Sequence, residues 1–229
     1  MRLGVRVGKG RQTPLDHKMC ELSCQRLQFD ELWGFIGKKE KHVRKDDDPT
    51  LGDVWTWVAI DADTKLVPTF RVGKRDHIEA NAFVADVASR MANRVQILTD
   101  GLRAYVEAIE ASFGSNVDYA QIVEIFDGYD MDAEVIGMDK TSVAERPDMR
   151  HASTIYVERL NGTTRQHMRR LTRLTYAFSK KLENFEAAVG LHFAYYNFVK
   201  RHNALRATPA MAAGIERDFW TVRDLVEAA

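Results

Sequence analysis

A short, mostly apolar segment, Val95–Leu98 (VQIL), is the part of the sequence that most limits the fold. A strand this short and apolar is typical of one that is covered on both faces of a sheet. Stretches with helical periodicity flank it: His77–Met91 repeats apolar residues at helical spacing, and Leu102–Phe113 is followed by a stop at Gly114. A further short strand, Tyr119–Phe126, is expected next. Helices that connect short buried strands predict a layered α/β fold with parallel strands in this region.

The segment before residue 75 has the character of antiparallel strands. Gln28–Ile36 mixes aromatic and aliphatic residues with two acids, and Val54–Ile60 is rich in β-branched and aromatic residues. Asp61 begins a turn, after which Leu66–Val72 returns as the partner strand, and Pro68 places that partner at an edge or a bulge. The sequence therefore predicts an α/β fold with a mixed sheet flanked by helices.

The chain has 229 residues and no formal net charge, but its charges are unevenly distributed. Residues 76–149 contain 5 Lys and Arg against 15 Asp and Glu, whereas residues 150–206 contain 11 against 3. Such asymmetry is typical of a polyanion-binding segment opposed by an acidic one, although the two surfaces can equally neutralise each other within the fold. No run approaches 18 consecutive apolar residues, and the basic start lacks the apolar stretch of a signal peptide. We therefore expect a cytoplasmic protein without a membrane segment.

The basic run Ser153–Arg173 is predicted to be a helix, and it contains a single acid, Glu158. Helical spacing places Asn161, Arg165 and Arg169 on the same face as this acid. A lone acid among cations favours a metal ligand or an ion pair over a solvated position. This face therefore carries an acid at the head of a basic track.

The segments on either side of the basic run differ in character. Residues 127–150 are acidic, aperiodic and punctuated by Gly and Pro, so we expect a loop or an insertion there. A last long helix is predicted over Leu182–Asn203, where Phe185, Val189 and Phe193 would form a buried stripe.

Two aspartates lie where a strand could present them to a ligand. Asp100 comes directly after a predicted buried strand, and ligands of α/β sheets bind beyond the carboxyl ends of strands. A turn or a helix cap is the other explanation for this residue. Asp30 lies inside a strand-like stretch, where an acid is unfavourable unless it is exposed or functional. For Glu158, the alternative to a role in a site is an ion pair with Arg159 or Arg165.

Two strand-borne aspartates and one helix-borne glutamate suit a site for divalent cations. Hard cations such as Mg²⁺ prefer carboxylate oxygens and retain water. Two such ions roughly 3.5–4 Å apart can activate an attacking oxygen and stabilise a leaving oxygen in phosphoryl transfer. Adjacent basic residues would neutralise and orient a phosphodiester backbone. The acids and the charge asymmetry together favour metal-dependent chemistry on a phosphodiester.

Three motifs contain these acids: DELWGFIG at 30–37, TDGLRAY at 99–105 and YVERLNGTTRQHMRRLTR at 156–173. Together they resemble the motifs of DDE transposases, most closely those of the insertion-sequence-one (IS-one) family. Supporting matches are WTWVAID at 55–61, AFSKKLEN at 177–184 and YYNFVKRHNALRATPAMAAGI at 195–215. The combination is specific, whereas any one motif alone is weak. The resemblance implies an RNase H-like core and Mg²⁺-dependent DNA cleavage and strand transfer.

The resemblance also implies a role for each acid. Asp30 and Asp100 would hold both of two Mg²⁺ or Mn²⁺ ions, and Glu158 would hold the second. Asp61 also ends a predicted strand and is an alternative first acid. The DELW motif favours Asp30 and leaves Asp61 in a hairpin turn. The residues expected to hold DNA phosphates are Arg165, Arg169, Arg170 and Arg173. Lys180 and Lys181 would extend this basic track unless they belong to solvated helix faces.

The same resemblance divides the chain and defines its hypotheses. Residues 1–25 are expected to be a lead-in without the DNA-binding module that family members usually carry, residues 26–206 the RNase H-like catalytic domain, and residues 207–229 a helical tail. The leading hypothesis is a prokaryotic, nucleoid-associated transposase that acts on transposon ends and target DNA. Because transposition joins two ends, a homo-oligomer is expected. The alternatives are a truncated, inert DNA-binding remnant or transposon regulator, and an RNase H-type nuclease, which lacks this motif set.

Overall fold

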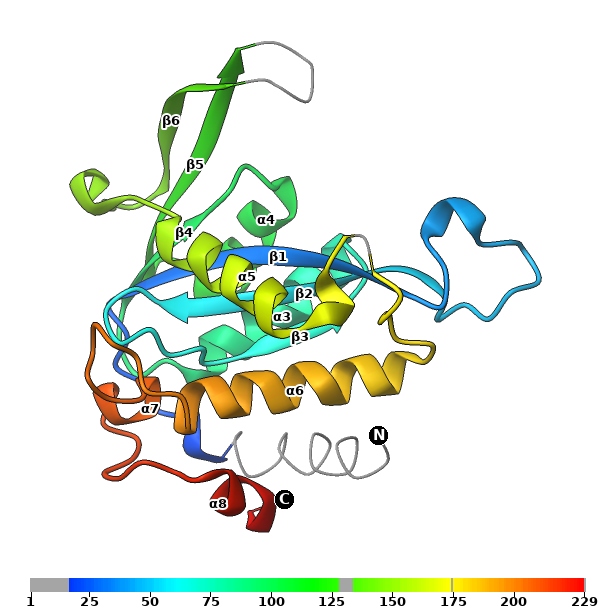
Figure 1. Cartoon of the computed structure of the whole chain (residues 1–229). Helices are drawn as coiled ribbons and strands as arrows, with labels where there is room; N and C mark the ends of the chain where they lie inside the picture. The colour runs from blue at the N-terminus through cyan, green and yellow to red at the C-terminus, as the bar shows by residue number, and fades with distance from the viewer. Residues whose placement is uncertain (1–16, 128–133, 174, 229) are drawn as a thin grey trace.

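A mixed sheet forms the centre of the protein in this computed structural model, which describes residues 17–127, 134–173 and 175–228 (Figure 1). Most of the expected lead-in, residues 1–16, and residues 128–133 of the expected insertion lie outside the described residues. Within the described part, the sheet contains β1 (Arg26–Ile36), β2 (Gly52–Asp61), β3 (Phe70–Gly73), β4 (Val95–Thr99), β5 (Val117–Asp127) and β6 (Glu134–Ala144).

Helices cover both faces of this sheet (Figure 1). On one face lie α3 (His77–Arg90) and α4 (Arg103–Phe113). On the other lie α5 (Ile155–His167) and the long α6 (Leu182–Phe198). None of the described helices combines the length and apolar composition needed to cross a membrane. The short helices are η1 (Glu40–His42), η2 (Met149–His151), η3 (Arg169–Leu171), α7 (Pro209–Ala212) and α8 (Val222–Glu227).

The strand order is β3-β2-β1-β4-β5-β6. The first three strands are antiparallel, β4 is parallel to β1, β5 is parallel to β4, and β6 returns antiparallel to β5. The expected mixed α/β sheet flanked by helices is therefore confirmed, and its topology is that of an RNase H-like fold. The pairing of β1 with β4 covers only Arg26–Gln28 against Gln96–Leu98. Beyond Gln28, β1 pairs with β2 and no longer with β4. β1 and the end of β4 therefore separate after this point.

The two faces of β1 are packed into two separate cores. Leu27 and Phe29 face α3 and α4, where the Phe29 and Phe83 rings lie 5.3 Å apart. Leu32 and Ile36 face α5 and α6 in the second core. Full burial of an aliphatic or aromatic side chain of this size contributes ~1.5–3 kcal/mol, so both cores hold β1 in place. Successive residues of the strand are thereby fixed to opposite faces.

The helix predicted over Ser153–Arg173 is shorter in the structure. It begins at Ile155 and ends at His167, and Met168 leaves the helical conformation with φ −115° and ψ 93°. Met168 and Leu171 are buried in the α5–α6 core, and a turn at this point is what brings both side chains there. Arg169 therefore lies in η3 and does not continue the helical face that carries Glu158 and Arg165.

A loop or an insertion is expected for residues 127–150, and the prediction of a loop is wrong for Glu134–Ala144, which forms β6. This strand pairs with β5 from Tyr119↔Ala144 to Asp127↔Glu134, with irregularities along the ladder. The hairpin extends beyond the helices, as Figure 1 shows, and apolar residues on both strands are exposed. Without one buried face, the sequence lacks the alternating pattern that indicates a strand. The exposed apolar residues are Val123, Ile125, Ile136 and Met138.

Two other predicted boundaries differ in the structure. The strand expected from Leu66 begins only at Phe70, because the backbone of Val67 bonds instead to the side chain of Asn197 on α6. That amide accepts from Val67 N at 3.0 Å and donates to Val67 O at 2.8 Å. The last long helix ends at Phe198 rather than Asn203.

Candidate active site

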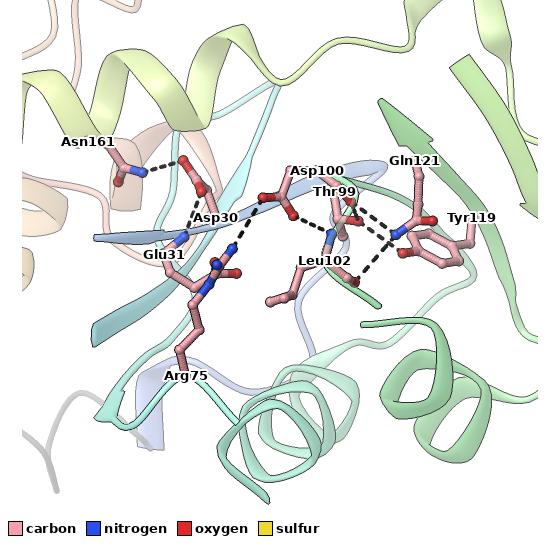
Figure 2. Close-up of polar contacts among 9 residues, drawn as sticks. All are labelled: Asp30, Glu31, Arg75, Thr99, Asp100, Leu102, Tyr119, Gln121 and Asn161. Carbon is pink, nitrogen blue, oxygen red and sulfur yellow. Dashed lines mark hydrogen bonds and ion pairs between the residues drawn. The ribbon is translucent and has the colours of Figure 1, made fainter. Parts of the chain in front are cut away.

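Asp30 lies in the middle of β1 and faces α5. Its Oδ2 accepts a 2.6 Å hydrogen bond from Asn161 Nδ2, and its Oδ1 accepts a 2.7 Å bond from the backbone N–H of Glu31 (Figure 2). Two donors on different elements therefore fix the orientation of this carboxylate. Asn161 lies on α5, so the helix and the strand are joined at this point.

Asp100 follows the last residue of β4. Its Oδ1 accepts from the backbone N–H of Leu102 at 3.0 Å, which shapes the turn into α4. Its carbonyl accepts from Gln121 Nε2 on β5 at 3.1 Å and from the Thr99 hydroxyl at 2.7 Å (Figure 2). The backbone is thus held on both sides, while the side chain stays 41% exposed and faces Asp30 across the gap.

Glu158 is placed by a contact between β1 and the start of α5. Gln28 on β1 is buried, and its Oε1 accepts from the backbone N–H groups of Tyr156 at 2.9 Å and Val157 at 3.0 Å. These donors have no partner within the helix, so a side chain from the neighbouring strand satisfies them. Glu158 comes next in the first turn, is exposed, and accepts a hydrogen bond from the Thr154 hydroxyl.

The structure brings the three predicted acids to one place. Asp30, Asp100 and Glu158 line an open cavity of about 470 Å³. The alternative first acid, Asp61, is buried elsewhere, opposite Leu27 in the β1–β2 ladder. Its Oδ2 accepts from the N–H of Thr64 at 3.0 Å and from the hydroxyl of the same residue at 2.5 Å. Asp61 thus has the contacts of a hairpin-turn residue.

A fourth acid, Glu31, is not among the residues that the sequence singles out. Carboxylate oxygens of Asp30, Glu31 and Asp100 all lie within 4.8 Å of one another. The Glu31 side chain is only 2% exposed, and Arg75 Nε lies 3.0 Å from its Oε2. The sequence does carry a signal: position 31 continues the alternation of Leu27 and Phe29, so an acid occupies a position that faces the apolar core.

Burial raises the pKa of two of these acids. The pKa of Asp30 is raised to about 6, first by burial and then by the charges of Asp100 and Glu158, against the opposing hydrogen bonds from Glu31 N and Asn161. Burial also raises the pKa of Glu31 to about 7, and the nearby hydroxyl of Tyr105 only partly offsets it. The hydrogen bonds to Asp30 and the Arg75 charge beside Glu31 only partly offset burial, and a bound cation would favour the charged forms of both acids further.

The donor set fits a divalent metal ion. Every candidate ligand atom is a carboxylate oxygen, the donor that Mg²⁺ and Mn²⁺ prefer. Asp30, Glu31 and Asp100 each offer an oxygen within 4.8 Å of the other two, as a shared divalent ion would require. Oε1 of Glu31 is buried without a hydrogen-bond partner among the described residues, as expected beside a cation site.

The predicted basic residues fall into two groups. Arg165 Nη1 donates to the carbonyls of Leu171 at 2.6 Å and Trp33 at 3.5 Å, so this guanidinium joins η3 to β1. Arg170 Nη1 donates to Ser179 Oγ at 2.7 Å. These two arginines are partly buried and hold the segment after α5 in place. The exposed group consists of Arg169, Arg173, Lys180 and Lys181.

No protein-family model matches the sequence, and no curated protein matches it. Among solved structures, the chain is similar to an intasome of simian T-cell lymphotropic virus in complex with the PP2A regulatory subunit B56 gamma. That match has 13% identity and a TM-score of 0.49, over 84% of this chain and 55% of the other. It is also similar to the Mos1 transposase paired-end complex with the left transposon end, at 17% identity and a TM-score of 0.27, over 52% of this chain and 42% of the other.

A third similar structure is the piggyBac transposase synaptic complex with hairpin DNA, at 10% identity and a TM-score of 0.40. This match covers 89% of the present chain and 52% of the piggyBac chain. The chain therefore spans about half the length of the proteins it matches. At these identities and TM-scores, the RNase H-like assignment depends on the sheet topology of the chain itself.

Proposed function

We propose that this chain is the catalytic core of a DDE transposase of the insertion-sequence-one family, which cleaves and joins DNA strands with divalent cations. One observation carries the proposal. Asp30, Asp100 and Glu158 come from three distant segments of the sequence, and all three line one open cavity. The motifs around them, and the RNase H-like topology that presents them, support the same function.

In this proposal Asp30 and Asp100 would hold two Mg²⁺ or Mn²⁺ ions, and Glu158, which bonds to Thr154 in the structure, would help to hold the second. Bound in this way, the ions would supply Lewis-acid activation of the attacking oxygen and stabilisation of the leaving oxygen. Asn161 keeps Asp30 oriented toward the cavity. Gln28, by holding the start of α5, keeps Glu158 at its edge.

The basic segment after α5 is proposed to hold the DNA backbone. Arg165 and Arg170 keep this segment against β1 and α6 through their hydrogen bonds to the carbonyls of Trp33 and Asn184. The exposed guanidinium and ammonium groups of Arg169, Arg173, Lys180 and Lys181 then contact phosphates, which carry most of the affinity for DNA. The DNA substrates are the two transposon ends and the target, in a prokaryotic, nucleoid-associated assembly of several copies of the chain.

A second candidate, a DNA-binding remnant or regulator without catalysis, is favoured by one observation. Glu158 is exposed, bonds to Thr154 and is not part of the group formed by Asp30, Glu31 and Asp100. A chain in which Glu158 never joins that group would keep its basic surface and bind DNA without turnover.

Cleavage of labelled DNA that carries the two ends of the encoding element tests the proposal. We expect the full chain to cleave this DNA with Mg²⁺ or Mn²⁺, and Asp100→Asn to abolish cleavage while DNA binding is retained. Asp46→Asn is the matched control, because Asp46 is an exposed acid of the loop after η1 and does not line the cavity. Binding without cleavage by the unmodified chain would leave the second candidate as the function.

A further inference from the structure

Arg75 lies beside the acids of the candidate site. Its Nε is 3.0 Å from Glu31 Oε2, and its Nη2 is 3.7 Å from Asp100 Oδ2 (Figure 2). Glu31 and Asp100 are also two of the three acids whose oxygens lie within 4.8 Å of one another. The guanidinium therefore gives these two carboxylates the positive charge that a bound cation would otherwise give them.

Glu31 has the capacity to bind a second positive group. Its side chain is 2% exposed and its ion pair with Arg75 is made through Oε2. Oε1 is buried and has no hydrogen-bond partner in the described part of the chain. The Tyr105 hydroxyl lies near enough to favour the charged form of this carboxylate, but no hydrogen bond of ordinary geometry joins the two groups. A buried carboxylate oxygen without a donor is unfavourable, so a ligand that reaches it is bound more strongly.

Arg75 is placed so that it can leave these acids without disturbing the fold. It lies between β3 and α3, and its side chain is 39% exposed. The backbone beside it is fixed, because Asp76 caps α3 by accepting from the N–H of Glu79. The guanidinium carbon lies 5.2 Å from the centre of the Trp55 ring, a flat surface that supports the group in more than one orientation.

We propose that Arg75 and a divalent cation compete for Glu31 and Asp100, with Glu31 acting as a further carboxylate of the cation site. Binding of the cation releases the guanidinium, which turns on the Trp55 ring toward a phosphate of the bound DNA. A planar guanidinium with several donors suits a phosphate as well as it suits a carboxylate. The phosphate depends on the transposase function proposed above, whereas the competition is a property of the protein alone.

Titration of the full chain with Mn²⁺ in a calorimeter, without DNA and at fixed pH and ionic strength, tests the competition. Arg75→Gln removes the competing charge, so its affinity for Mn²⁺ should rise roughly three- to tenfold. Arg71→Gln is the matched control, because Arg71 pairs with Glu79 and makes no contact with the candidate acids. It should bind Mn²⁺ as the unmodified chain does. Arg75→Lys, which keeps the charge, should also leave the affinity close to the original and guards against a folding defect.

Glu31→Gln separates a cation ligand from a simple partner of Arg75. If Glu31 binds the ion or lies next to it, Glu31→Gln should weaken Mn²⁺ binding roughly 10- to 100-fold, because the substitution removes a negative charge. The proposal is overturned if Arg75→Gln leaves Mn²⁺ affinity unchanged or weaker, if Glu31→Gln leaves it unchanged, or if the unmodified chain binds no Mn²⁺. Competition without DNA cleavage would contradict the transposase proposal alone, and cleavage without competition would contradict only the role of Arg75.

Discussion

Asn161 on α5 donates a 2.6 Å hydrogen bond to Asp30 on β1, and this contact joins the helix that carries Glu158 to the strand at the centre of the sheet. The same helix is held at its start by Gln28, two positions before Asp30 on β1. Two polar side chains thus set the position of α5 against β1. The geometry of the candidate site depends on this pair of contacts.

Asn161→Ala tests the first contact. The bond from Asn161 lowers the pKa of Asp30, so its loss should raise that pKa above its present value of about 6. Divalent-cation-dependent activity should then need a higher pH, and its rate at neutral pH should fall roughly tenfold or more. The pH profile of DNA cleavage measures both effects. Asn203→Ala, at an exposed position after α6, should leave the profile unchanged.

Gln28→Ala tests the second contact. Two backbone N–H groups at the start of α5 lose their acceptor, so the free energy of unfolding should fall by about 1–2 kcal/mol, the cost of losing a helix cap. Denaturant unfolding measures this change. Gln25→Ala is the control, because Gln25 is exposed just before β1. Equal stabilities of the two variants would contradict the capping role of Gln28.

The pH dependence of stability follows from the raised pKa of Asp30, about 6 against an ordinary 3.8. Between those values the folded state binds more protons than the unfolded state. The contribution of Asp30 to the free energy of unfolding is therefore fully present below the ordinary pKa of 3.8 and is lost as the pH rises through the folded-state pKa of about 6. At pH 8 the charged Asp30 carboxylate lowers the free energy of unfolding by about 2–3 kcal/mol relative to its value at low pH. Asp30→Asn should thus stabilise the cation-free protein more at high pH than at about pH 4, as thermal unfolding at both pH values would show.

The salt dependence of DNA binding tests the exposed basic segment. Replacing Arg169 and Arg173 with Gln removes two exposed charges beyond α5. The slope of log K against log salt should become shallower by roughly one for each phosphate that the variant no longer binds. Lys41→Gln combined with Lys45→Gln, in the exposed loop around η1, is a charge-matched control and should keep the original slope. An unchanged slope for the arginine variant would place the DNA elsewhere.

The mixed sheet flanked by helices could be predicted from the sequence, and Asp30 and Asp100 could be named as candidate acids of its site. Short apolar segments alternate with helical stretches between residues 77 and 126, Asp100 follows one of the apolar segments, and Asp30 lies inside a strand-like stretch. Glu31 could not be assigned in the same way. Alternation places it on the opposite face of β1 from Asp30, and both reach Asp100 only because β1 and β4 stop pairing after Gln28.

Other features depend on tertiary contacts that local patterns do not show. Helix α5 ends at His167 because the chain turns there to bury Leu171. The helical periodicity of the sequence gives no sign of this burial. The contacts of Arg165 follow from that turn, because its guanidinium bonds the Leu171 carbonyl. The position of β6 depends on a ladder with β5 outside the core.

The rate of DNA cleavage by Glu158→Gln tests the central claim most directly, because Glu158 distinguishes a catalytic site from an inert one. Glu158 lines the cavity with Asp30 and Asp100, yet in the structure it bonds to Thr154. The account predicts that Glu158→Gln binds end DNA as tightly as the unmodified chain and loses its Mn²⁺-dependent cleavage. Cleavage at an unchanged rate would show that the three acids do not form one active site.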